Sequence, residues 1–259
     1  MSETPLIQLE NVVLKFGEKA VLDGINLRIF HKDRLVILGQ SGGGKSTMLR
    51  LILGILKPTS GKVRYKHLQM HKLSRSKLNL LRTRIGMVYQ NSALISSMTV
   101  RENLALPVEE LGRKNRTEIE HLISKNLEAV GMEGTEDKMP SELSGGMKKR
   151  VSLARALMLQ PELILFDEPS AGLDPVISSV IDELIIGLTE RTHATSVIVT
   201  HEMDSAFRIA TRLAMLYQGR IIEEGSPENF RNSSNSIVRQ FVTGTTEGPM
   251  TETLVHADL

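Results

Sequence analysis

The stretch "RLVILGQSGGGKST", residues 34–47, decides the fold of this chain. Four apolar residues follow Arg34, and such a short run is typical of a strand buried in a parallel sheet. A glycine-rich loop comes next, and "KSTMLRLILGIL" (45–56) then continues with helical spacing. The loop fits the pattern G-x-x-x-x-G-K-[ST], and it has the strand before it and the helix after it that this motif requires. The stretch therefore predicts an α/β fold with a phosphate-binding loop.

The residue types of this loop suit a nucleotide. Glycines let backbone N–H groups close around phosphates, Lys45 can reach the β and γ phosphates, and Ser46 offers a hydroxyl to Mg²⁺. A glycine-rich turn before an ordinary helix is the alternative, and the order of strand, loop and helix disfavours it. The predicted ATP contacts in the loop are Gly39, Gln40, Ser41, Gly42, Gly43, Gly44, Lys45, Ser46 and Thr47.

A second apolar run, "LILFDE" (163–168), ends in two carboxylates. Burying a strand that ends on paired acids is costly without partners. We expect Asp167 to hold Mg²⁺, directly or through water, and Glu168 to polarise a water for attack on the γ-phosphate. A solvated strand end is the alternative, and it is weakened by the phosphate loop in the same chain.

Two further strands end in polar residues. His201 ends "TSVIVTH" (195–201) and Gln90 ends "RIGMVYQ" (84–90). Ligands of open α/β sheets bind at the carboxyl ends of strands, so we interpret His201 as a contact to the γ-phosphate and the attacking water. Gln90 is interpreted as a neutral ligand near Mg²⁺ that senses the nucleotide state. A structural role is the alternative for each.

Phe16 and Asp174 each allow two interpretations. Core packing is the default for a phenylalanine, but the position of Phe16 beside Gly17 favours a loop, where its ring could stack on adenine. Asp174 precedes Pro175 and could cap a helix. Because it follows the predicted catalytic strand so closely, it could instead contact a second subunit.

A second phosphate-binding end is predicted at "LSGGMKKR" (143–150). Ser144, Gly145 and Gly146 stand at an apparent helix start, where free N–H groups and the helix dipole favour an anion. One chain does not need two such ends for one nucleotide, and a γ-phosphate facing solvent suits phosphoryl transfer poorly. We therefore predict a head-to-tail homodimer in which these residues cap the partner's ATP, so that ATP closes the dimer and hydrolysis opens it.

Composition sets broader limits. The 259 residues carry a net charge of +2, with 3% aromatic residues and no Cys. These values argue against a nucleic-acid partner and exclude disulfides and Cys-based metal sites. No signal peptide is evident, and no apolar run reaches the roughly 18 residues of a spanning helix. Any membrane role is therefore expected to depend on a partner.

The pattern along the chain suggests an organisation. Strand-rich segments occupy 6–30, helical patterns occupy about 91–160, and strands and helices alternate afterwards. Residues 213–225 suggest a hairpin turning at Gln218–Gly219. The tail after Pro227 is rich in Ser, Asn, Thr and Gly and is expected to hold little core.

From about residue 6 to 226, these elements in this order resemble the ATP-binding subunit of ABC transporters. The similarity includes Phe16 before Gly17, the loop 39–47, Gln90, "LSGG" (143–146), "FDEPSAGLD" (166–174) and His201. It implies a P-loop NTPase domain with an N-terminal antiparallel β part, an inserted helical subdomain at about 91–160 and a C-terminal extension at 227–259. By this resemblance the site residues fall into three sets: the catalytic residues Glu168, His201 and Gln90; the Mg²⁺ ligands Ser46, Gln90 and Asp167; and the contacts across the dimer, Ser144 to Gly146 and Asp174.

A narrower resemblance is to the MlaF group, which powers lipid transport with Mce-type proteins. It rests on "NSALISSMTVRENLALPV" (91–108), "MPSELSGGMKKRVSLARAL" (139–157), Met147, and the tail "VRQFVTGTTEGP" (238–249), while Gln40 departs from the proline common in these loops. It implies an MlaE-like multi-span permease, whose coupling helix is accepted by residues just after Gln90, and an Mce-domain lipid carrier. It also implies a place on the cytoplasmic face of the inner membrane, peripheral through the permease. A small regulatory subunit is left open.

Three other functions stay open at this point. The chain could energise transport of another solute, such as an amino acid or an ion. It could be a soluble ABC-type ATPase of translation or DNA repair, although it has neither two such domains nor long coiled coils. It could be a non-catalytic ATP-binding regulator, which intact Lys45, Asp167, Glu168 and His201 disfavour.

Overall fold

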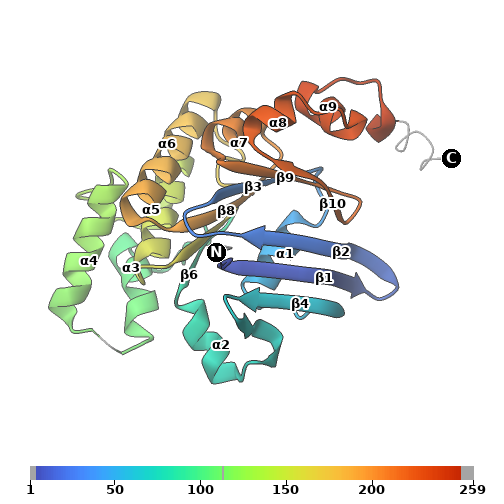
Figure 1. Cartoon of the computed structure of the whole chain (residues 1–259). Coiled ribbons are helices and arrows are strands. Elements are labelled where there is room, and N and C mark those ends of the chain that lie inside the picture. The colour runs from blue at the N-terminus through green and yellow to red at the C-terminus, as the bar shows by residue number, and fades with distance from the viewer. Residues whose placement is uncertain (1–3, 113, 252–259) are drawn as a thin grey trace.

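The computed structural model describes residues 4–112 and 114–251. Figure 1 shows two sheets, with most of the helices on one face of the larger sheet and the smaller sheet on the other. The larger sheet has the strand order β10-β9-β3-β8-β7-β6, and the smaller has the order β2-β1-β4-β5. The predicted α/β class, with an antiparallel N-terminal part, is thereby confirmed.

The larger sheet is parallel except for β10 at its edge. Its strands are β3 (Arg34–Leu38), β6 (Ile85–Val88), β7 (Leu163–Asp167), β8 (Thr195–Thr200), β9 (Arg212–Tyr217) and β10 (Arg220–Gly225). The central strands β3, β7 and β8 are almost wholly buried, which accounts for their continuous apolar sequences. This sheet brings the ends of β3, β6, β7 and β8 to one edge.

Successive side chains of these strands face opposite layers. Leu35 and Ile37 of β3 pack in one core with the smaller sheet and α1 (Lys45–Ile52), while Val36 and Leu38 pack in a second core with the helices. The same alternation holds along β7, where Leu163 and Leu165 separate from Ile164 and Phe166. Alternate side chains of each strand point to opposite faces of the sheet, and both faces are buried, so the apolar run of each strand is unbroken.

The smaller sheet is antiparallel throughout. It contains β1 (Ile7–Phe16), β2 (Lys19–Ile29), β4 (Ser60–Tyr65) and β5 (Leu68–Gln69). The short helix η1 (Met70–Lys72) and α2 (Arg75–Arg82) connect it to β6. The strand-rich segments predicted over 6–30 are thus confirmed.

The helical part lies between β6 and β7 in the sequence and forms one flank of the molecule in Figure 1. It consists of α3 (Val100–Glu109), α4 (Arg116–Ala129), the short η2 (Pro140–Glu142) and α5 (Gly145–Leu157). One apolar face of α4 is buried, and its residues are Ile119, Leu122, Ile123, Leu127 and, just past the end of the helix, Val130. The expected helical pattern from residue 91 was wrong at its start, because 91–99 form turns and α3 begins only after the capping box of Thr99 and Glu102.

The remaining helices are α6 (Pro175–Thr192), α7 (Met203–Ile209), α8 (Pro227–Arg231) and α9 (Ser236–Thr243). The predicted hairpin is confirmed, since Gln218 and Gly219 both have positive φ between β9 and β10. The first helix is shorter than the expected 45–56, because it ends at Ile52 and Gly54 turns with φ +70.

The expectation for the tail was wrong. Phe230 and Val238 of α8 and α9 are fully buried, and Met250 is 6% exposed; all three belong to the core on the helical side of the larger sheet. The polar composition concealed a few well-spaced apolar residues that fix the tail against the sheet. Residues 252–259, also part of the predicted extension, lie outside the described residues.

Candidate functional site

The phosphate loop lies between β3 and α1, as its sequence predicts. A Cβ at Gly39 would overlap the carbonyl oxygen of Leu216, so glycine is required there. Gly44, at φ +98, precedes α1 and offers no side chain to cap it. The first N–H groups of α1 therefore remain available to an anion, which is the arrangement that phosphates bind.

Lys45 is turned back onto its own loop. It is 5% exposed, and its Nζ donates to the carbonyl oxygens of Gly39 at 2.8 Å and Gln40 at 3.1 Å. The same Nζ lies 3.5 Å from Oε1 of Glu168. A buried ammonium needs such partners, and all of them could exchange for phosphate oxygens.

Two acids follow β7, and each has a distinct environment. Oδ1 of Asp167 accepts a hydrogen bond of 2.7 Å from Oγ of Ser46. Glu168 is 8% exposed, has a positive φ of 49°, and donates its backbone N–H to Val199 at 3.0 Å. Both of its carboxylate oxygens lie 3.1 Å from Nδ1 of His201. This left-handed backbone turns the carboxylate from the strand toward Lys45 and His201.

Five of the predicted site residues therefore meet at the carboxyl ends of three neighbouring strands: Lys45, Ser46, Asp167, Glu168 and His201. Ser46 and Asp167 form a pair of hard oxygen donors, which suits Mg²⁺. No group of three or more His, Cys, Asp or Glu that could hold a metal is found within residues 4–112 and 114–251. A site of two protein oxygens completed by phosphate and water is the usual form for Mg²⁺.

The other predicted residues are placed apart from this cluster. Gln90 is exposed, and its backbone carbonyl accepts a hydrogen bond from Nζ of Lys149. Phe16 is 54% exposed at the end of β1, so it is not a core residue. It pairs with Lys19 in the hairpin whose Val21 carbonyl lies beside Gly44. This position leaves the ring free next to the phosphate loop.

The second predicted phosphate-binding end is a helix start. Ser144 is the N-cap of α5, and its Oγ accepts a hydrogen bond from the N–H of Met147. Ser144 and Gly145 are exposed. A Cβ at Gly145 would meet only Leu173 Cδ2 at 3.5 Å, an ordinary contact, so the fold itself does not require glycine there. Among the described residues, no hydrogen bond or ion pair joins Ser144, Gly145 or Gly146 to the cluster.

Sequence reasoning missed Lys149, which was concealed in the basic run behind "LSGG". Its side chain is buried, and its Nζ donates to the carbonyl of Gln90 at 2.5 Å and to that of Glu168 at 3.3 Å. Burial lowers the pKa of its ammonium. One residue of α5 thus ties together the two loops that carry Gln90 and Glu168.

A second missed network lies behind His201. Oγ of Ser170 donates to Glu202 at 2.9 Å, and Oγ of Ser205 donates to the fully buried Asp182 at 2.8 Å. Burial raises the pKa of Asp182, although Arg208 lies 2.8 Å from its carboxylate.

Asp174 caps α6 through the N–H groups of Val176 and Ile177.

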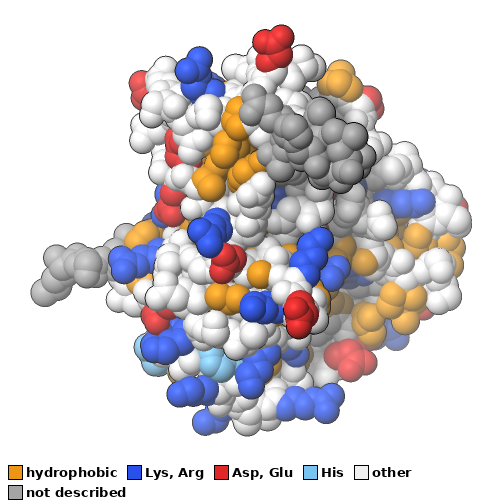
Figure 2. Space-filling model, turned by 90° about the vertical axis from the view of Figure 1, so that its right-hand side faces the viewer, with side chains coloured by type: hydrophobic (Ala, Val, Ile, Leu, Met, Phe, Trp, Pro, Cys, Tyr) orange, Lys and Arg blue, Asp and Glu red, His pale blue; other side chains and the backbone are white. Residues whose placement is uncertain are grey.

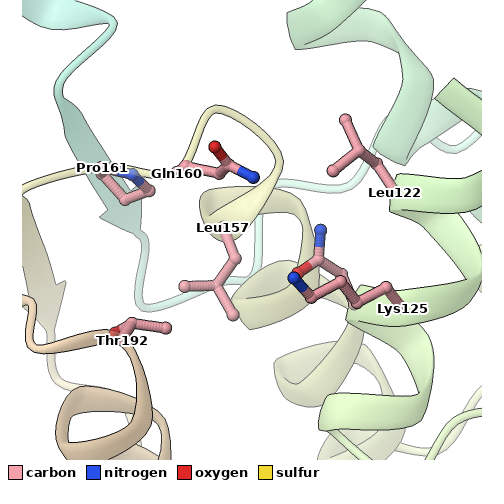
Figure 3. Close-up of a pocket in the computed structure, with 7 residues that line it drawn as sticks. Leu122, Lys125, Leu157, Gln160, Pro161 and Thr192 are labelled. Atoms are coloured by element: carbon pink, nitrogen blue, oxygen red, sulfur yellow. The ribbon is translucent and has the colours of Figure 1, made fainter. Parts of the chain in front are cut away.

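A separate cavity of about 120 Å³ lies between α4, the end of α5 and the end of α6. Its lining includes Leu122, Leu157, Pro161 and Thr192, with the polar ends of Lys125 and Gln160 (Figure 3). None of these residues belongs to the phosphate loop or the acid cluster. The cavity is too small for a nucleotide and is not the candidate site.

No described helix is long and apolar enough to span a bilayer.

Comparisons with known proteins identify the family of this chain. Residues 22–171 match the family model described as ABC transporter. The protein TRIGALACTOSYLDIACYLGLYCEROL 3, chloroplastic, of Arabidopsis thaliana is 39% identical over 95% of this chain and 75% of its own length. The intermembrane phospholipid transport system ATP-binding protein MlaF of Haemophilus influenzae is 37% identical over 95% of this chain and 93% of its own length.

Among solved structures, the ATP-binding cassette MJ0796 in a dimeric post-hydrolysis state bound to ADP and Pi aligns with a TM-score of 0.78. It is 33% identical, and the alignment covers 85% of this chain and 98% of that one. This chain therefore belongs to the ABC transporter family, in which it is an MlaF-like ATP-binding subunit and an ATP hydrolase.

Proposed function

We propose that two copies of this chain bind ATP between them, head to tail, and that ATP hydrolysis drives lipid transport through a membrane permease. The observation that carries the first part is the separation of two phosphate-binding ends. One end belongs to the cluster of Lys45, Asp167 and Glu168. The other, at Ser144 and Gly145, is exposed and joined to none of them. A partner chain supplies the missing half of each site.

The contacts of Lys45 suggest that ATP binding precedes activation of the base Glu168. Lys45 neutralises Glu168 at 3.5 Å before nucleotide enters. Phosphate oxygens compete for this ammonium because they are stronger acceptors than backbone carbonyls. Once Lys45 turns to the phosphates, the Glu168 carboxylate keeps His201 as its neighbour and can accept the proton of the attacking water.

The remaining roles follow from position. Ser46 and Asp167 would hold Mg²⁺, which neutralises charge on the β and γ phosphates; Gln90 is proposed to reach it once nucleotide is bound. The ring of Phe16 is proposed to stack on adenine. Ser144, Gly145 and Gly146 cap the partner's γ-phosphate, and the loop of Asp174 contacts the partner beside them. The small residues at the start of α5 allow a phosphate to approach its N–H groups closely.

The similarity to MlaF supports phospholipid as the transported substrate. We propose an MlaE-like multi-span permease, docked at the residues just after Gln90, and an Mce-domain carrier that receives or supplies the lipid. The chain would then lie on the cytoplasmic face of the inner membrane, peripheral through its permease. We also propose 6–226 as the ATP-binding domain and 227–259 as an extension that reaches the partner subunit, of which 252–259 lie outside the described residues.

Transport of another solute is the remaining alternative, because the same ATPase geometry would serve it. The test is purification of the tagged full-length chain from its own membranes in mild detergent, followed by mass spectrometry of proteins and lipids. A multi-span permease with an Mce-domain protein and bound phospholipid is the expected result. A periplasmic solute-binding system, or no membrane protein at all, would leave the ATPase intact and remove the lipid assignment.

A further inference from the structure

The small net charge of this chain conceals a strong separation of charge. Residues 34–101 contain 13 Lys and Arg and no Asp or Glu, so the other 19 Lys and Arg share the rest of the chain with all 30 acids. The basic segment includes β4, β5, η1 and α2. In Figure 2, Lys and Arg side chains with histidine among them gather on the lower part of the molecule, the level at which α2 lies in Figure 1.

This surface is hollowed, and we call the hollow the basic groove. It consists of two adjoining cavities of about 410 Å³ and 180 Å³ that share Leu73. Its apolar floor includes three exposed side chains, Ile55, Leu68 and Leu80, which are 52%, 39% and 51% exposed. Its cationic and imidazole lining consists of Lys57, Lys66, His67, His71, Lys77 and Arg84.

Half of the lysine and arginine side chains that line the groove have no acid to balance them. Glu162 pairs with Lys66 at 2.7 Å and with Arg84 at 2.9 Å. Lys57 and Lys77 are exposed and pair with no carboxylate among the described residues, and the same is true of Lys72 and Arg75 beside the groove. These four side chains leave an excess of positive charge around the groove.

Their positions are unfavourable for the isolated fold. Arg75 and Lys77 occupy the first turn of α2, where the helix dipole favours anions and where no acidic residue is present. Burial and the nearby charges of Lys57 and Lys72 lower the pKa of His71, so both ammonium groups face the same imidazole. Mutual repulsion and an opposed helix dipole weaken the fold slightly, and a bound polyanion would relieve both.

We propose that the basic groove rests on the anionic phospholipid surface of the membrane. This proposal depends on the membrane location given above, because only there is such a surface at hand. Cations near an anionic bilayer are each attracted by roughly five-fold in binding constant, and neighbouring apolar side chains enter the boundary between headgroups and acyl chains. The groove supplies both, because its lining includes the cations Lys57 and Lys77 and the exposed apolar side chain of Leu80.

Single-stranded RNA fits the same surface less well. Such a ligand is bound by stacking its bases on exposed aromatic rings. The aromatic residue that lines the groove, Tyr65, is only 2% exposed, and its hydroxyl donates to Glu162 at 2.9 Å. Exposed leucines between cations match a lipid interface instead.

The test is co-sedimentation of the full-length chain with vesicles of phosphatidylcholine alone or with 30% phosphatidylglycerol. The wild type should bind the anionic vesicles, less tightly at higher salt. The variant Lys57→Gln/Lys72→Gln/Arg75→Gln/Lys77→Gln removes four cations and should lose roughly 600-fold in affinity, by the per-cation attraction above. The matched control Lys114→Gln/Arg116→Gln/Lys125→Gln/Lys138→Gln removes four exposed charges from the helical part and should bind as the wild type does.

Two companion measurements make the result decisive. The groove variant should melt at the wild-type temperature or higher, because it removes cations from the start of α2, and its basal ATPase rate should be unchanged. Equal loss in both variants, or equal binding to the two kinds of vesicle, would overturn the proposal. If single-stranded RNA displaces the chain from anionic vesicles when its phosphate concentration equals that of the lipid, the groove would be reassigned to nucleic acid. Vesicle binding and recovery of a permease from native membranes are separate measurements. Failure of the lipid-surface proposal is therefore distinguishable from failure of the proposed function.

Discussion

Replacing Lys149 with Met should slow ATP hydrolysis without weakening ATP binding. The ammonium donates to the carbonyl of Gln90 at 2.5 Å and to that of Glu168 at 3.3 Å. A hydrogen bond from a charged group contributes about 1.5–3 kcal/mol, and the second contact is too long to add much. If about 2 kcal/mol of this is used to hold Glu168 and Gln90 in the reacting arrangement, kcat falls roughly 30-fold.

Methionine fills the volume of the buried lysine stem and removes the cost of burying an ammonium, so the free energy of unfolding should change by less than about 1 kcal/mol. The assay is steady-state kcat together with the dissociation constant for ATP, each compared with Lys148→Met. Lys148 lies next to Lys149 on α5 and is partly exposed. A kcat within two-fold of wild type, or a lower melting temperature with unchanged kcat, would refute this positioning role.

Three other predictions concern the site and its surroundings. Glu168→Gln should keep ATP binding, lower turnover by at least about 100-fold and accumulate an ATP-bound dimer in size-exclusion chromatography; near wild-type turnover would mean that another group is the base. Phe16→Ala should change the free energy of unfolding by less than about 0.5 kcal/mol but weaken ATP affinity by roughly ten-fold in a fluorescence titration, because the ring is 54% exposed and adds nothing to the core. Asp182→Asn should remove a pH dependence of the free energy of unfolding. The pKa of Asp182 is raised on folding, so between about pH 4 and this raised pKa the folded state binds more protons than the unfolded state. Wild-type stability therefore falls as the pH rises through this range. Urea unfolding at pH 4 and pH 7 measures this slope, and an unchanged slope in the variant would exclude Asp182 as its source.

Much of the fold could be predicted because local patterns and global packing agree. The run from Arg34 to Thr47 contains a buried strand, a glycine loop and a helix start, and each is formed where its residues indicate. Strands ending in Asp167 and Thr200 were recognisable because buried parallel strands are continuously apolar. Their shared direction then brings the polar residues that follow them to one edge.

What the sequence could not predict depends on contacts between distant segments. Lys149 looks like one of three basic residues in a row, and only packing of α5 against two loops distinguishes it from Lys148. The pairing of Lys45 with Glu168 joins residues more than a hundred positions apart. Phe230 lies in a polar stretch, so its burial could be seen only after the tail was placed on the larger sheet.

Complementation between two inactive variants tests most directly whether each ATP is bound by two chains. Lys45→Ala removes the phosphate-loop cation, and Gly145→Asp places a negative charge where the partner's γ-phosphate is expected. An acid is favourable at a helix start, so the second variant should fold well. Each variant alone should lack a complete site.

In a 1:1 mixture, half of the dimers contain one chain of each kind, and each of these has one intact site and one site that carries both defects. The mixture should therefore recover up to roughly a quarter of the wild-type ATPase sites, since phosphoryl transfer needs both halves. Recovered hydrolysis would support the head-to-tail arrangement. No recovery, in a mixture shown by cross-linking to contain mixed dimers, would contradict it and return Ser144 to Gly146 to the nucleotide of their own chain.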